Sequence, residues 1–150
     1  MYAKNLRRIL CIIAAAIFIL LTACTAPPDS SGEKTQIGTV TFEVNAKNAV
    51  AWGKDNLPEG GALYPAQSVP LYEGESVMAI LLRILPDQVD KQGSYVAGIC
   101  SLRERDCGAA SGWYYYVNGE APQMSTAKWQ PQDGDVIRFL YTVKGGDIPY

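Results

Sequence analysis

The hydrophobic and polar residues of this chain follow two periods, one typical of strands and one typical of a helix. Apolar residues alternate with polar ones from Val40 to Val44, which indicates a half-buried strand. Between Ser76 and Pro86 the apolar spacing changes to i, i+3, i+4, which predicts a helix with one apolar stripe. The stripe consists of Val77, Ile80, Leu81, Ile84 and Leu85. Ser76 is placed to cap this helix and Pro86 to end it.

Strand patterns occupy most of the remaining chain. The stretches 62–64 and 69–72 indicate two short strands, the second at a sheet edge because it contains a proline. The segments 95–99, 112–117 and 136–143 indicate three more, rich in aromatic residues. Strands, one helix and then strands predict an α+β fold in which the helix packs on one face of a mixed sheet.

Two turn signals divide the last third of the chain. Asn118-Gly119 follows the aromatic strand, and this dipeptide is the strongest short-range signal for a tight hairpin turn. Asp133-Gly134-Asp135 predicts a second turn before the last strand, with the aspartates bonded to nearby main-chain amides. Both motifs are therefore interpreted as turns and not as metal sites.

A different pattern fills the first 24 residues. Positive charges come first (Lys4, Arg7 and Arg8), and an apolar run at 9–21 follows that is short for a membrane span. Ala23 is a small residue directly before Cys24. The run resembles the lipobox of bacterial lipoproteins, in which the signal is cleaved before a cysteine whose thiol then receives a diacylglyceryl group. An ordinary signal peptide near a cysteine and an uncleaved anchor are the alternatives.

The resemblance to a lipobox implies where the protein resides. Residues 1–23 would be the signal peptide, and lipidated Cys24 would hold the chain on the extracytoplasmic face of the cell membrane, since two acyl chains give a stable anchor. Residues 24–38 would be a flexible tether, because they are rich in proline, serine and glycine. Removal of 23 of the 150 residues leaves 127, room for one domain at about 39–150.

Charge and cysteine content narrow the chemistry. The signal carries three of the 13 basic residues and none of the 15 acidic ones, so the mature chain has 10 − 15, a net charge of −5. That charge argues against binding to nucleic acid. Cys100 and Cys107 remain after processing in a compartment where disulfides persist, so we expect a disulfide between them, with two free thiols as the alternative.

Catalysis and metal binding find little support in the sequence. The chain has no histidine, the commonest general base and transition-metal ligand. Two thiolates alone leave tetrahedral zinc coordination incomplete. Glu73 and Glu75 are explained by the positive end of the helix. We therefore predict no catalytic residues, no metal and no required cofactor, and a protein that is not an enzyme.

The aromatic strand and its surroundings resemble a known family. The segments Ser111–Gly119 (SGWYYYVNG) and Trp129–Ile137 (WQPQDGDVI), with the helix entry at Glu73–Val77, are similar to the transcobalamin-like C-terminal domain family. The resemblance covers about residues 39–143. It implies a β-grasp fold, a curved mixed sheet that holds one helix.

The family also implies a ligand. In vitamin B12 carriers of animals this small domain closes over one face of a corrinoid that a larger helical domain holds. The resemblance therefore implies half of a shared corrinoid site, completed by a transporter or a second binding protein.

The aromatic side chains supply the candidate ligand contacts. Alternation places Trp113 and Tyr115 on one face of their strand, predicted as core, with Tyr114 and Tyr116 on the other. The predicted ligand-binding residues are those on or near the open face of the sheet, Tyr114, Tyr116 and Trp129, together with Met124 of a covering loop. Exposed aromatic rings suit a ring-shaped ligand or a protein partner, although sheet packing explains them equally well. We expect a lipid-anchored binding domain, and a protein-interaction or adhesion module is the alternative.

Overall fold

The computed structural model describes residues 34–148, and these form two α-helices, a 3₁₀ turn and seven strands. The elements in chain order are β1 (Gln36–Asn45), α2 (Lys47–Trp52), η1 (Glu59–Gly61), β2 (Ala62–Tyr72), α3 (Val77–Ile84), β3 (Val89–Gln92), β4 (Tyr95–Ile99), β5 (Leu102–Arg103), β6 (Gly112–Val117) and β7 (Val136–Thr142). The predicted signal peptide, the predicted lipidation site Cys24 and most of the predicted tether lie outside the described residues.

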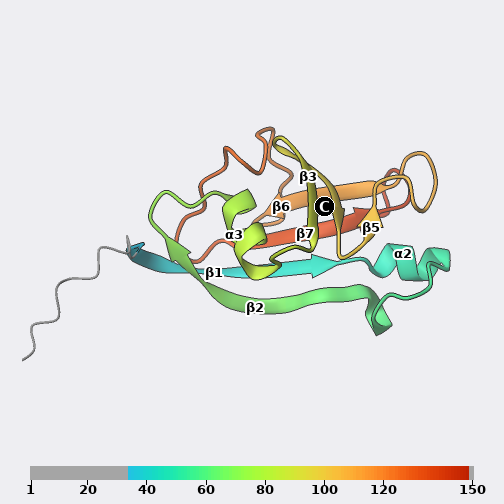
Figure 1. Ribbon diagram of the computed structural model, residues 1–150, viewed down its shortest axis with the longest axis horizontal. Coiled ribbons are helices and arrows are strands. Elements are labelled where there is room, and N and C mark those ends of the chain that lie inside the picture. Colours follow the sequence, from blue (N-terminus) through green and yellow to red (C-terminus); the bar gives the residue numbers. More distant parts are fainter. Residues whose placement is uncertain (1–33, 149–150) are drawn as a thin grey trace, which may run out of the picture. The chain divides into compact units, whose positions relative to one another are not determined.

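The strands form two sheets. The larger has four strands in the order β2-β1-β7-β6, and β1 and β7 are parallel while the other two pairs are antiparallel (Figure 1). The smaller sheet has three short strands in the order β3-β4-β5. The α+β class and the mixed sheet are thus confirmed, but the expected single sheet is not, because β4 pairs with its sequence neighbours and not with the larger sheet.

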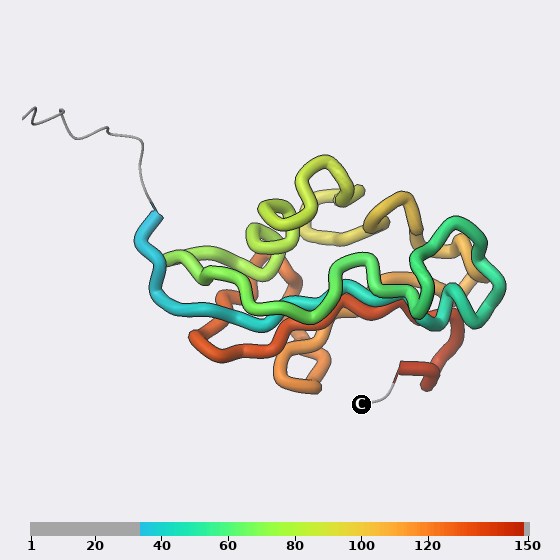
Figure 2. Tube along the Cα trace, turned by 90° about the horizontal axis from the view of Figure 1, so that it is seen from below, coloured from blue at the N-terminus to red at the C-terminus, as the bar shows by residue number. Residues whose placement is uncertain are grey.

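The core lies on one face of the four-stranded sheet. Alternate residues of its strands point to this face and are almost fully buried, among them Val40, Phe42, Val44, Ile137, Phe139 and Tyr141. The apolar stripe of α3 packs in the same cluster, and Figures 1 and 2 show α3 and the β3–β4 hairpin on the same side of the sheet. Burial of these side chains is the main stabilising contribution, about 1.5–3 kcal/mol for each large one.

The boundaries of α3 follow the sequence signals closely. The Ser76 hydroxyl accepts a hydrogen bond from the Ala79 N–H at 3.2 Å, which confirms the predicted cap. The helix ends at Ile84, two residues before Pro86.

The turn after β6 is also confirmed. Asn118 and Gly119 both have positive φ, 52° and 88°, as a two-residue hairpin turn requires. The Asn118 amide fixes this turn to the start of β7, since its Nδ2 donates to Asp135 and its Oδ1 accepts from the Val136 N–H, at 2.8 and 2.9 Å. The Asp133 carboxylate accepts from the Thr39 N–H at 2.8 Å, which joins the second turn to β1.

The predicted disulfide is not formed, and the alternative of two free thiols is what the structure has. Cys100 occupies the tight turn between β4 and β5 with φ 49°, and its thiol donates to the Gln88 side chain at 3.3 Å. Cys107 is 1% exposed and packs in the core cluster. Burial raises the pKa of both thiols, so neither is activated as a nucleophile.

Two further features concern the helices. The short helix α2 was not predicted, because six residues are too few to show a helical period. Within residues 34–148, no helix has the length and apolar character that a membrane crossing requires.

Candidate functional site

A groove runs beside β6, an edge strand of the four-stranded sheet. Its volume is about 330 Å³, and its walls come from β6, from the start of β4 and from the loop after β6. The large side chains of the lining are Tyr95, Val96, Trp113, Tyr114, Tyr115, Pro122 and, from β7, Phe139. We call this hollow the β6 groove. Its size is at the lower end of the range for small-molecule sites, about 300–1,000 Å³.

Buried contacts fix the side of the β6 groove that faces the core. Trp113 Nε1 donates to the Leu102 carbonyl at 2.9 Å, which joins β6 to β5. Tyr115 stacks on Phe139 with the ring centroids 6.0 Å apart, and its hydroxyl donates to the Met124 carbonyl. Trp113 also packs edge-on against Tyr141, with the ring centroids 5.1 Å apart. Because each of the two aromatic side chains is held at two points, this wall is formed before any ligand arrives.

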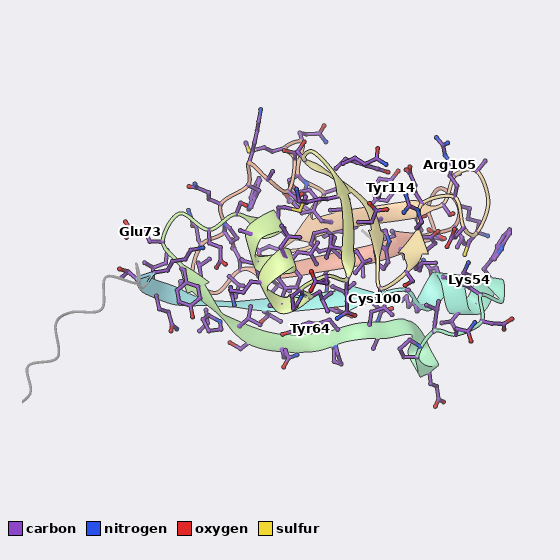
Figure 3. The ribbon with its side chains drawn as sticks, in the orientation of Figure 1. Lys54, Tyr64, Glu73, Cys100, Arg105 and Tyr114 are labelled. Carbon is purple, nitrogen blue, oxygen red and sulfur yellow. The ribbon has the colours of Figure 1, made fainter. Side chains whose placement is uncertain are left out.

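Two exposed tyrosines form the rim of the β6 groove. Tyr95 is 46% exposed and Tyr114 is 54% exposed, the latter with Arg105 on the same side of the domain (Figure 3). The Tyr95 hydroxyl donates to the Glu104 carboxylate, and this bond raises the pKa of Tyr95 to about 12. The Tyr95 phenol is therefore neutral at physiological pH. The exposed rings of Tyr95 and Tyr114 both offer flat faces to a ligand.

The loop after β6 contributes an unusual polar atom. Ser125 lines the β6 groove, and its buried hydroxyl has no hydrogen-bond partner among residues 34–148. The nearby Trp129 Nε1 is likewise buried without a partner in the described part of the chain. Such atoms are rare in folded proteins, where nearly all buried polar groups bond to protein or to ordered water.

The structure separates the four predicted ligand-binding residues. Tyr114 and Tyr116 line a second hollow of about 230 Å³ on the face of the sheet opposite the core. Met124 is 47% exposed in the loop anchored by Tyr115. Trp129 is half-buried against the core, where its carbonyl accepts from the Val77 N–H at 3.0 Å. Of the four, Tyr114 alone lines the β6 groove.

Tyr116 requires a correction. We expected it on the open face of the sheet, but it is 5% exposed. The reason is the segment after β7: Gly145, Gly146 and Ile148 line the same hollow and shield the ring from solvent. The predicted core positions are closer to the structure, since Trp113 is buried and Tyr115 half-buried.

Sequence reasoning missed the wall of the β6 groove that lies across from β6. Tyr95 and Val96 belong to a strand that was predicted, but no local pattern tells which element lies opposite its start. Pro122 gave no signal at all. The site is formed by tertiary contacts and therefore escapes a reading based on periodicity.

No group of three or more cysteine, aspartate or glutamate side chains within 34–148 is arranged to hold a metal ion.

One family model matches part of the chain. Residues 74–143 match the model of a domain of unknown function, DUF4430. This match runs from the turn before α3 to the end of β7, and it includes both walls of the β6 groove. No curated protein matches the chain.

Two solved structures are similar at low identity. One is a candidate metal-binding protein from Ruminococcus gnavus ATCC 29149, with 14% identity, a TM-score of 0.45, and coverage of 70% of this chain and 96% of the other. The other is haptocorrin in complex with Cbi, with 10% identity, a TM-score of 0.46, and coverage of 73% of this chain. The matched part is 26% of haptocorrin, about a quarter of its length.

Proposed function

We propose that this protein is a lipid-anchored binding domain of β-grasp type on the extracytoplasmic face of the cell membrane. The observation that carries the binding function is the β6 groove, a pre-formed hollow with a fixed aromatic wall and two exposed tyrosines at its rim. Concave, largely apolar sites with a few polar groups are the usual form of ligand sites.

The ligand class that we propose is a planar, cofactor-like molecule, and a corrinoid is the specific candidate. The corrinoid comes from the family resemblance and is an analogy. The groove supplies a chemical reason as well, because the exposed Tyr95 ring at its rim can cover one face of a flat ligand.

The size of the groove favours a shared site. A corrin ring with its side chains is larger than a hollow of about 330 Å³, so this domain would cover only part of it. A second protein, a transporter or another binding protein, would cover the other face. In this mechanism the lipid anchor keeps the domain near such a partner.

Titration of the full chain in detergent with cyanocobalamin or cobinamide tests the ligand. We expect saturable heat by calorimetry and loss of most of that heat in Tyr95→Ala/Tyr114→Ala. Trp52→Ala is the matched control, because Trp52 is 59% exposed on α2, outside the groove. No heat at near-millimolar corrinoid would reject capture of free corrinoid.

Metabolic labelling tests the anchor separately. Cells that express the full chain and are fed radiolabelled palmitate should label the protein, and Cys24→Ala should abolish the label. Equal labelling of both proteins would reject Cys24 as the lipidation site.

The interaction or adhesion module stays as the second candidate. The feature that favours it is the free edge of β6, since an unpaired edge strand is a template for another chain. Affinity for a polypeptide with no response to corrinoids would support it.

A further inference from the structure

The main chain of β6 has an open stretch that faces the groove. In an antiparallel ladder, successive residues point their N–H and C=O groups alternately toward and away from the partner strand. The Asn118 N–H donates to the Val136 carbonyl at 2.9 Å, so even-numbered residues of β6 face β7. The main-chain groups of Trp113 and Tyr115 therefore point away from β7, toward the free edge.

Both ends of this edge are closed by the chain itself. The Ser111 carbonyl accepts from the Arg105 N–H at 2.9 Å. Val117 exchanges two main-chain hydrogen bonds with Glu120, at 2.9 and 3.0 Å. Between these closed positions lie residues 112–116, and no residue of the described chain bonds to the four edge-facing groups of Trp113 and Tyr115.

The closed ends limit what can pair with the edge. A second copy of this chain that paired β6 with β6 around Tyr114 would bring residue 111 of one copy opposite residue 117 of the other. Both positions are already covered, so the covering segments would collide. The stretch between them spans about five residues, roughly 17 Å at 3.4 Å per residue, which is the length of an extended pentapeptide.

The charged residues at the two ends of the open stretch favour one direction for a bound peptide. Arg105 is exposed at the Ser111 end and Glu120 is exposed at the Val117 end. Neither side chain forms an ion pair with another residue in the range 34–148. A peptide antiparallel to β6 would place its carboxylate near Arg105 and its ammonium group near Glu120.

We infer that the β6 groove binds a short peptide with free termini as an added antiparallel strand. The peptide residues opposite Tyr115 and Trp113 exchange four main-chain hydrogen bonds with them, and their side chains enter the groove beside Val96 and Pro122. The middle residue lies beside Tyr114 on the opposite face. This inference does not rest on the corrinoid, but the two ligands share the groove and are expected to compete.

The probe is the pentapeptide Ala-Val-Ala-Val-Ala, titrated into the full chain in detergent with ¹⁵N-labelled protein. We expect the amide signals of Trp113 and Tyr115 to move on binding. Methylation of the peptide nitrogens at its second and fourth residues removes the donors that face β6, and should weaken binding by about tenfold or more. Methylation at the third residue, whose N–H faces solvent, is the matched control and should change the affinity little.

Two charge variants test the direction. Arg105→Gln and Glu120→Gln should each lower the affinity for the peptide a few-fold at low salt. Arg105→Gln should have no effect on a peptide with a blocked carboxyl terminus, and Glu120→Gln should have none on a peptide with a blocked amino terminus. Both side chains are exposed, so neither variant should alter the fold.

The outcomes separate this inference from the corrinoid proposal. No binding at millimolar peptide, or equal affinity for the parent and the doubly methylated peptide, would overturn the inference. Binding of cobinamide in the same sample would then leave the corrinoid proposal standing. Binding of the peptide without any heat from cobinamide would support the peptide inference and reject capture of free corrinoid.

Discussion

The two edges of the four-stranded sheet are built in different ways. At one edge, β2 carries Pro65 and Pro70, and the Pro70 carbonyl is covered by Arg83 at 2.7 Å. At the other edge, β6 contains no proline and keeps four main-chain groups open beside an aromatic groove. Prolines and covering side chains are common protection against unwanted strand pairing. The protein thus protects one edge and leaves part of the other open, and the open stretch is the one to which we assign the proposed peptide site.

The protection of β2 depends on an ion pair that also fixes α3. Glu75 is 4% exposed and accepts from Arg83 Nε and Nη2 at 2.8 and 3.1 Å. The guanidinium lies over the Tyr72 ring, 5.0 Å from its centroid. A buried carboxylate and an aromatic ring therefore hold Arg83 against the edge of β2. In this fixed conformation its guanidinium donates to the Pro70 carbonyl.

The largest effect is expected from removing this carboxylate. Glu75→Ala leaves Arg83 without its partner and the Tyr72 N–H without an acceptor, so we expect a loss of about 3 kcal/mol in the free energy of unfolding. Urea denaturation measures it. Glu73→Ala is the matched control, because Glu73 is exposed nearby and should change the stability little. Equal effects of both variants would contradict the role given to the buried pair.

A smaller effect is expected at the β6 edge. Trp113→Phe keeps an aromatic ring but removes the hydrogen bond to the buried Leu102 carbonyl, so we expect a loss of about 1–3 kcal/mol. The same denaturation experiment measures it, with Tyr114→Phe as the control because Tyr114 is half exposed. If Trp113→Phe were as stable as the parent, β5 would not depend on this bond for its position.

The difference between the edges was only partly predictable from the sequence. Proline chemistry correctly placed 69–72 at a sheet edge, but Pro65 suggested a break where the structure has one continuous strand of 11 residues. The strand survives because an edge strand can direct a residue without an N–H toward solvent. Local rules thus identified β2 as an edge strand but did not predict the length of the strand.

Signals from single elements were reliable, whereas contacts between elements were not. The cap at Ser76 and the turn at Asn118-Gly119 are fixed by residues within a few positions, and both were predicted correctly. The burial of Tyr116 depends on a segment 30 residues later in the chain, near Gly146, and its exposure was predicted wrongly. The β6 groove has the same origin, because Tyr95 and Tyr115 come to line one hollow only in the folded protein.

The smallest effect that we predict concerns the rim of the open edge. The bond from Tyr95 to Glu104 favours the neutral phenol, whose pKa is raised from 10.0 to about 12. Since the folded pKa is above the unfolded one, the stabilisation is complete below pH 10 and is lost as the pH rises toward 12. Glu104→Gln should bring the pKa of Tyr95 back toward 10, which absorbance titration of the phenolate measures against Tyr95→Phe as the control. An unchanged titration curve in Glu104→Gln would mean that the carboxylate does not hold Tyr95, and that this rim of the groove moves freely while the aromatic wall of β6 stays fixed.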